Sequence, residues 1–241
     1  MVAEWVAAQK SETLTHQILT WGGDKPETAI MEAARTARYE LMAAYCKAHH
    51  IQNLWVAHHQ DDQAETFLIR LSKGSGLDGL SAMQEVREYN EDLKILRPLL
   101  DFSKQDLIEY CQAHQVPFIQ DPSNENEEYL RPRLRQSMAV LEGEGLTSKR
   151  LASTSKRLSR ARQALEDITN SAFQACLIEK TEERSTFNFS TLQGCPAEIA
   201  LRVLQKSMES MREGANYNIR MERLEDLFES LWLAPQEFKP R

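Results

Sequence analysis

The sequence has few cysteines and no long apolar run. Its 241 residues include four cysteines, and no two of them form a C-x-x-C pair, so neither a zinc-ribbon signature nor a redox motif is present. No stretch approaches the roughly 18 uncharged apolar residues of a membrane helix. The N-terminus also lacks the basic start and apolar core of an export signal. We therefore expect a cytoplasmic protein that neither inserts into a membrane nor is exported.

An overall excess of basic residues is also lacking. The formal net charge is −7 at pH 7, and 41% of the residues are hydrophobic. An ordinary apolar fraction over this length excludes a chain that is disordered throughout, and it suits one large domain or two smaller ones. The negative charge excludes a protein that is basic everywhere, so any contact with nucleic acid has to come from a local patch.

Strand-like and helical segments alternate over the first 120 residues. Apolar residues recur at helical spacing in 25–50, and the next run, 51–57, is typical of a strand buried on both faces of a parallel sheet. Two further strands are predicted at 93–100 and 116–120, and helices are expected after the first two strands. The alternation predicts an α/β domain with a partial Rossmann-like parallel sheet and flanking helices.

Local signals also predict where the helices begin and end. The helix after the first strand stops at Gly74, which has the freedom of φ that a helix C-cap requires. Ser103 and Asp106 have the spacing of an N-capping pair at the start of the next helix.

Near residue 145 the sequence pattern changes from alternating strands and helices to helices alone. A long helical pattern follows over 147–180, and the segments 197–212 and 220–233 also have helical spacing. We therefore predict two domains: an α/β domain spanning 1–145 and a smaller, all-helical and incomplete domain spanning 146–241.

The most polar cluster of the sequence comes directly after an apolar run. In "WVAHHQDDQAETF", residues 55–67, two histidines, two aspartates and a glutamate lie within eight positions. If 51–57 is a strand, the cluster lies at its carboxyl end, where open α/β sheets bind ligands. Three interpretations are open: a metal site, a nucleotide or amine pocket, or a helix start at which Asp61 and Asp62 cap the helix and complement its dipole.

The acidic spacing within this cluster suits a bound cation. Glu65 lies three residues after Asp62 and four after Asp61, so on a helix it shares a face with either aspartate. Such a pair can hold an ammonium group or a divalent cation. A metal hydrolase would need His58, His59, Asp61 and Asp62 to supply mixed nitrogen and oxygen ligands, but adjacent residues rarely point at one ion.

The segment "AHHQDDQAETFLIRLSKGSGLDGLSAM", 57–83, closely resembles a motif block of the tRNA(Ile)-lysidine synthetases, a branch of the N-type ATP pyrophosphatase (PP-loop) superfamily. Three more blocks resemble the same family in the same order: "EAARTARYELM" (32–42), "RPLLDFSKQDLIEY" (97–110) and "DPSNENEEYLRPRLR" (121–135). Four ordered blocks are far more specific than any one motif.

The resemblance implies an enzyme, a carbon–nitrogen ligase that acts in tRNA modification. Members of the family use ATP to adenylate the C2 carbonyl oxygen of the wobble cytidine of tRNA(Ile), and the side-chain amine of free L-lysine then displaces AMP and leaves lysidine. ATP and Mg²⁺ are therefore the expected cofactors, and tRNA(Ile) and lysine the expected partners. A homodimer is considered as the assembly, and no membrane contact is expected.

Site roles also follow from the resemblance. Asp62 and Glu65 match the D-x-x-E positions associated with lysine recognition, and they are expected to be catalytic together with Arg38. His58 and His59 match the paired histidines beside ATP, and the A-A-R-x-x-R-Y pattern directs Arg35 and Arg38 toward ATP. Guanidinium suits that task because it stays charged and donates in a fork. The alternative for each histidine or arginine is a structural role, at a strand end or on a solvated helix face.

A basic stretch inside this acidic chain points to RNA. Residues 129–162 contain nine Lys and Arg against two Glu, which is a local charge of +7. Contacts with RNA phosphates are the natural use of such a patch, although solvated helix faces are also often basic. If "RPRLR" is extended, its three arginines lie on one side. The expected tRNA-binding residues are Arg131, Arg133, Arg135, Lys149, Arg150 and Arg157.

The S-G-G-x-D-S loop that cradles the ATP pyrophosphate in this superfamily is absent from the 241 residues. We therefore expect an internal piece of a longer enzyme, with little or no lysidine formation by this chain alone, because the nucleotide would lose its main amide hydrogen bonds. Two alternative functions remain open: a non-catalytic tRNA-binding remnant, and a metal-dependent phosphohydrolase.

Overall fold

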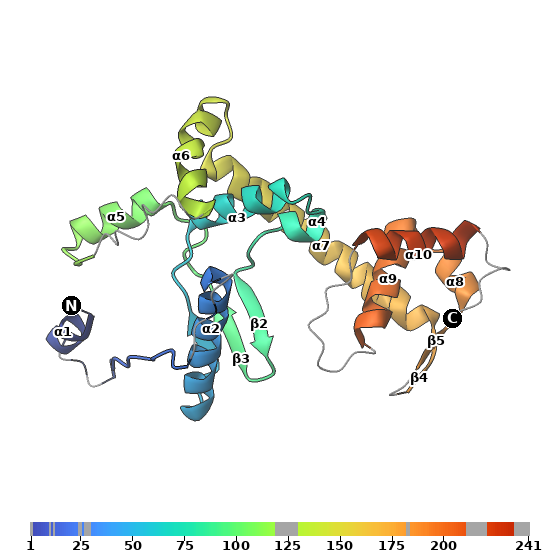
Figure 1. Cartoon of the computed structure of the whole chain (residues 1–241), viewed down its shortest axis with the longest axis horizontal. Coiled ribbons are helices and arrows are strands. Elements are labelled where there is room, and N and C mark those ends of the chain that lie inside the picture. Colours follow the sequence, from blue (N-terminus) through green and yellow to red (C-terminus); the bar gives the residue numbers. More distant parts are fainter. Residues whose placement is uncertain are drawn as a thin grey trace. The chain divides into compact units, whose positions relative to one another are not determined.

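The computed structural model divides into two compact units, which are described separately (Figure 1). The first comprises Met1–Ile69 and Met83–Ala152, and the second comprises Arg70–Ala82 and Ser153–Arg241. The domain boundary predicted near residue 145 stays a prediction. The structure describes residues 2–9, 11, 13–23, 26, 30–118, 130–181, 184–210 and 221–233.

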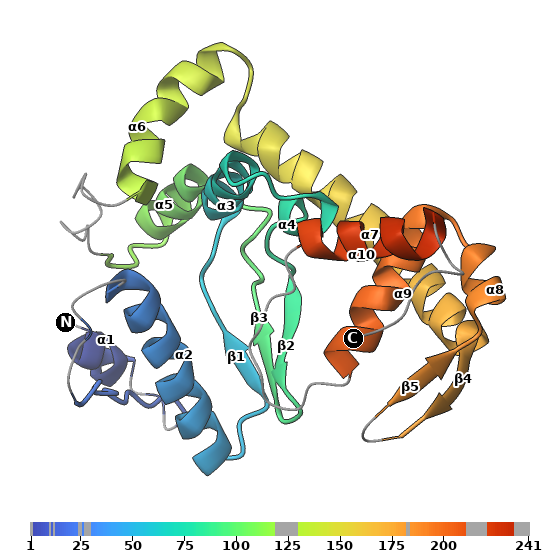
Figure 2. The same cartoon turned by 45° about the vertical axis from the view of Figure 1, so that its right-hand side comes forward.

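A small mixed sheet lies at the centre of the first unit (Figure 2). The strand order is β1-β3-β2, with β1 parallel and β2 antiparallel to β3. Ile95, in the middle of the central strand, is 1% exposed and pairs with Leu54 on one side and Arg87 on the other. The elements of this unit are α1 (Val2–Ala8), α2 (Ile30–Ala48), β1 (Asn53–Trp55), most of α3 (Gln60–Ser72), β2 (Val86–Asn90), β3 (Leu93–Leu96), α5 (Lys104–Ala113), α6 (Leu130–Gly143) and the start of α7 (Ser148–Cys176).

The observed sheet confirms the mixed α/β class and the parallel pair of strands, but it corrects the predicted strands. The run 51–57 was expected to be buried on both faces, whereas Trp55 is 66% exposed. Among the described strands β1 pairs only with β3. The antiparallel strand β2 was not predicted. Residues 116–118 are not in a strand, and 119–120 lie outside the described residues.

The predicted helix signals around the polar cluster are confirmed. α3 ends next to Gly74, whose φ of 71° is the left-handed conformation expected of a C-cap. At the start of α5, the Ser103 hydroxyl accepts from the Asp106 backbone N–H, and the Asp106 carboxylate accepts from the Ser103 backbone N–H. This capping box fixes the direction in which α5 leaves β3.

The second unit contains α4 (Leu77–Leu80), the rest of α7, β4 (Leu177–Lys180), β5 (Ser185–Phe187), α8 (Phe189–Gln193), α9 (Ala197–Ser210) and α10 (Met221–Leu233). Its core contains Phe173, Ile199 and Val203. The prediction of an all-helical second domain was wrong, because β4 and β5 form an antiparallel hairpin. No helix in the described part of the chain is long and apolar enough to cross a membrane.

Replacing Ile95 with Ala tests whether β3 is the centre of the first unit. The substitution removes buried methyl groups from a closely packed strand, so we expect the free energy of unfolding to fall by about 2–5 kcal/mol. Chemical denaturation followed by circular dichroism measures the change. Lys94→Ala on the same strand, at an exposed position, is the matched control and should change stability by about 0.5 kcal/mol or less. Equal effects of the two substitutions would contradict the observed register.

Candidate functional site at the β1–α3 junction

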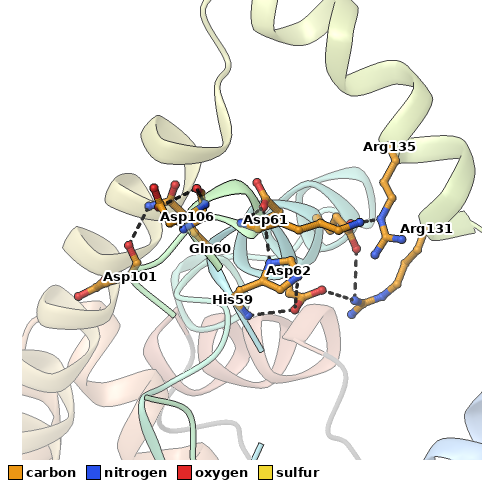
Figure 3. A network of polar contacts seen from close by, with 11 residues as sticks. His59, Gln60, Asp61, Asp62, Asp101, Asp106, Arg131 and Arg135 are labelled. Carbon is orange, nitrogen blue, oxygen red and sulfur yellow. Dashed lines mark hydrogen bonds and ion pairs between the residues drawn. The ribbon is translucent and has the colours of Figure 1, made fainter. Parts of the chain in front are cut away.

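The polar cluster lies where β1 gives way to α3, at the carboxyl end of the parallel strand pair (Figure 3). Two hydrogen bonds tie this connection to the one between β3 and α5: Gln60 N donates to Phe102 O at 2.8 Å, and Lys104 N donates to Asp61 Oδ2 at 2.8 Å. The two connections therefore lie side by side, as expected for neighbouring parallel strands.

Asp62 and Glu65 lie within the first two turns of α3, and both are buried. The Glu65 side chain is only 3% exposed, and the Asp62 side chain is 13% exposed. Asp62 Oδ2 accepts from the His59 backbone N–H at 3.0 Å, so this aspartate also caps the start of α3. Capping gives Asp62 Oδ2 a hydrogen-bond partner, but it provides no partner for the buried carboxylate of Glu65.

Two arginines of α6 neutralise these carboxylates (Figure 3). Arg135 Nε lies 2.5 Å from Glu65 Oε1, and Arg131 Nη1 lies 3.3 Å from Glu65 Oε2. Arg131 Nη1 also lies 3.7 Å from Asp62 Oδ1. Each buried carboxylate thus has a cationic partner, as an ion taken out of water requires.

This arrangement corrects the picture of "RPRLR" as an extended segment. Residues 130–143 form α6, so Arg131 and Arg135 are four apart on a helix and share one face, while Arg133 is displaced from it. The sequence assigned the arginines to RNA and Glu65 to lysine, and did not foresee that they pair. No local pattern signals this contact, because 66 residues separate Arg131 from Glu65.

His58 is held in its neutral form. Burial lowers its pKa from 6.5 to about 4; the negative charge of Asp62 acts in the opposite direction, while the positive charges of Arg97, Arg35 and Arg131 add to the lowering. Its Nδ1 atom is buried and has no hydrogen-bond partner among the described residues. His58 is thus a neutral imidazole with an unused nitrogen, and the charges of one carboxylate and three arginines act on it.

Arg97 is a member of the cluster that the sequence did not single out. It directly follows β3, is buried, and donates from Nη1 to Gln84 O at 2.9 Å. Burial lowers its pKa, and a side-chain hydrogen bond with Tyr39 opposes that effect. An arginine directly after a strand at this edge of the sheet is the signal that could have identified it.

The other predicted site residues are exposed at the surface. Arg35 and Arg38 are exposed on α2, and the Arg35 guanidinium stacks 5.8 Å from the centre of the Tyr39 ring. Arg150 Nη1 donates to Gly145 O at 2.9 Å. Lys149 and Arg157 are exposed on α7. The functional roles of these and of all the other predicted site residues stay predictions.

The histidine beside the acidic pair contacts two aspartates. His59 Nδ1 lies 3.5 Å from Asp61 Oδ2, and His59 Nε2 lies 3.5 Å from Asp62 Oδ2. Within the ranges that the structure describes, no group of three His, Cys, Asp or Glu residues has the arrangement needed to hold a metal ion. Asp62 and Glu65 instead pair with guanidinium groups of the same chain.

Together these features define an α/β domain whose strand-to-helix junction gathers carboxylates on one side and a neutral histidine among cations on the other. Residues 3–141 match the family model described as "PP-loop domain". The chain therefore belongs to the PP-loop domain family.

The chain is also similar to curated proteins named tRNA(Ile)-lysidine synthase. It is 40% identical to the one from Rhodopseudomonas palustris over 220 residues, which are 90% of this chain and 62% of the relative. The relative from Methylobacterium nodulans is 39% identical over 217 residues, 89% of this chain and 63% of the relative. A third, from Wolbachia pipientis, is 37% identical over 79% of this chain and 44% of the relative. The chain thus spans less than two thirds of the length of these relatives.

The depressed pKa of His58 predicts a pH-dependent stability. Between pH 6.5 and about 4 the unfolded chain binds a proton at this residue that the folded chain does not, so the contribution of His58 is complete above pH 6.5 and is lost as the pH falls toward 4. His58→Gln removes this loss. Relative to wild type, the variant should gain about 1 kcal/mol between pH 6.5 and 4, given the partial exposure of the ring.

Urea denaturation at a series of pH values measures the difference between wild type and variant. His16→Gln, at an exposed position, is the control and should leave that difference flat. A flat difference for His58→Gln as well would show that the ring is not held neutral.

Proposed function

We propose that this chain is the amine-binding part, and a portion of the nucleotide-binding part, of an enzyme that ligates lysine to C2 of the wobble cytidine of tRNA(Ile) with consumption of ATP. The observation that carries the proposal is the buried pair Asp62 and Glu65, which binds cationic side chains on one face of α3. The names of the similar proteins support the same assignment.

The acidic pair suits the side-chain amine of lysine. Glu65 is almost inaccessible to solvent and Asp62 is nearly so, so a cation that reaches them forms charge-assisted hydrogen bonds in a poorly screened environment. Because the carboxylates stabilise the ammonium, the amine becomes nucleophilic only after a base takes its proton, and we assign the proton to a carboxylate of this pair. Proton removal near these carboxylates is therefore part of their proposed catalytic role.

The residues on the other side of the junction suit ATP in part. His58 offers a buried nitrogen without a partner, and Arg35, Arg97 and Arg131 act on it with positive charge, which favours a polyanion. Arg38 and His59 extend this proposed nucleotide site. When bound, ATP supplies the adenylyl group that makes the cytidine C2 oxygen a leaving group. Mg²⁺ would accompany the ATP phosphates rather than occupy a cage of protein ligands.

RNA contact is assigned to the basic residues of α6 and the start of α7. The side chains of Arg131 and Arg135 are each about one third exposed, at 35% and 36%, so a phosphate can reach them. Arg133, Lys149 and Arg150 complete the proposed basic surface of the first unit, and Arg157, which belongs to the second unit, is also proposed to contact RNA. A homodimer and a cytoplasmic location belong to the same proposal.

A second function is favoured by the local basic charge of residues 129–162. These residues could serve a protein that binds tRNA without forming lysidine, because phosphate contacts need no nucleotide site.

Nucleoside mass spectrometry distinguishes the two functions. A tRNA(Ile) with a wobble cytidine is incubated with ATP, Mg²⁺ and lysine, and either this chain or the same chain extended upstream in frame. We expect lysidine from the extended chain only. Asp62→Asn in the extended chain should lower lysidine formation about tenfold or more, since it removes a charge from the amine pocket, and leave tRNA affinity nearly unchanged.

Asp92→Asn, at an exposed position between β2 and β3, is the matched control and should behave as the wild type. Lysidine from neither chain would favour the tRNA-binding remnant. An equal loss of tRNA affinity in Asp62→Asn would show that the amine pocket is misassigned.

The basic surface is tested by the salt dependence of tRNA binding. Replacing Arg131, Arg133 and Arg135 together with Gln removes up to three phosphate contacts, so tRNA affinity should fall and the slope of log K against log salt should become shallower by about 2–3. Filter binding at several salt concentrations measures the slope. The combined variant of exposed Arg87, Lys94 and Arg223 removes the same charge elsewhere, and equal slopes in the two variants would contradict a specific phosphate role.

A further inference from the structure

Helix α6 is attached to the first unit with little apolar support. None of its 14 residues is buried, and Leu130 and Val140 are both exposed, Val140 at 72%. A surface helix in a folded domain ordinarily owes most of its stability to a buried apolar face. Arg131 and Arg135 of α6 form ion pairs with the buried Glu65, and Arg131 also lies 3.7 Å from the buried Asp62.

A cavity adjoins these ion pairs. It has a volume of about 200 Å³, and its walls include Glu65, Arg135, His59 and Asp61 as well as the cationic Lys104. The guanidinium of Arg135 therefore lies at the wall of a space that also reaches the acidic start of α3. A cation entering this space meets a carboxylate that an arginine of the same chain already holds.

The same arginines are suited to two anions that they cannot bind at once. Glu65 uses Arg135 through Nε and Arg131 through Nη1. A phosphate oxygen that takes the same N–H groups in its own geometry has to draw them away from the carboxylate. The partial exposure of both arginines lets a phosphate approach from solvent, whereas the burial of Glu65 keeps the carboxylate from following.

We propose that α6 is a latch: Arg131 and Arg135 occupy the cation pocket of Asp62 and Glu65 until an RNA phosphate backbone binds these arginines and frees the pocket for the ammonium of the substrate amine. The inference rests on the proposed function, and it adds the regulation of that site. The latch keeps the two carboxylates paired while no RNA is bound, which avoids the cost of an isolated buried charge. It also makes amine binding depend on the presence of RNA.

Thermodynamic linkage makes the latch measurable. If RNA raises the affinity for lysine by some factor, lysine must raise the affinity for RNA by the same factor. Removing the arginines should instead give an open pocket from the start. If the closed form outnumbers the open one by about tenfold, the variant binds lysine about tenfold more tightly than the wild type in the absence of RNA.

The test measures lysine affinity by calorimetry on the whole chain, with and without saturating tRNA(Ile) transcript. The proteins are the wild type, the combined Arg131→Gln and Arg135→Gln variant, and the control Arg87→Gln with Lys94→Gln. We expect tRNA to tighten lysine binding in the wild type and the control, and the latch variant to bind lysine tightly without RNA and to gain little from it. Measurable lysine binding of equal affinity in all proteins, whether or not tRNA is present, would overturn the latch.

Hydrogen–deuterium exchange separates failure of the latch from failure of the proposed amine site. Glu65→Gln removes the carboxylate that holds α6, so exchange in 130–143 should become faster, whereas Glu88→Gln at an exposed position of β2 should leave it unchanged. Unchanged exchange in Glu65→Gln would overturn the latch. If exchange becomes faster but no protein binds lysine, the latch stands and the proposed amine site is wrong.

Discussion

The buried carboxylate of Glu65 is the constraint on which the charged residues of the first unit depend. Its side chain is 3% exposed, and an unpaired ion at such a position costs several kcal/mol after relaxation. Arg131 and Arg135 meet this need from α6, a helix that has no buried residue of its own. Burial of one acid is therefore compensated by two arginines of a helix far along the chain. Removing Glu65 or its arginines leaves a charge without this partner. Replacing one cationic partner of Glu65 with another therefore costs less than leaving the carboxylate unpaired.

The junction carries opposite charges on its two sides. Carboxylates on α3 attract cations, while Arg97, Arg35 and Arg131 create a positive environment that helps to keep His58 neutral. Asp62 and Arg131 belong to both sides, since each changes the pKa of His58 and they lie 3.7 Å apart. A site built in this way can bring a cationic amine close to a polyanion, which the proposed ligation requires. A displacement of Arg131 would therefore change both the pairing of Asp62 and the charge environment of His58.

Features that depend on neighbouring residues in the chain could be predicted from the sequence, whereas features that depend on distant residues could not. The helix α5 followed from the spacing of Ser103 and Asp106, and the end of α3 followed from Gly74, because capping involves neighbours along the chain. The strand β2 could not be predicted from its sequence, because its segment is charged and has no apolar pattern. It is a strand because it forms backbone hydrogen bonds with β3. The burial of β1 was overestimated, because an apolar run does not reveal whether another element covers each face of its strand.

The sequence by itself determined that Asp62 and Glu65 share a helix face, and that His58 and His59 lie where a strand ends. These relations depend on the helical period and on the order of elements, both of which are local. Only the tertiary structure decided which group neutralises Glu65. The arginines that do so lie 66 and 70 residues farther along the chain, and contacts at that separation arise from packing of the whole unit rather than from any pattern near either residue.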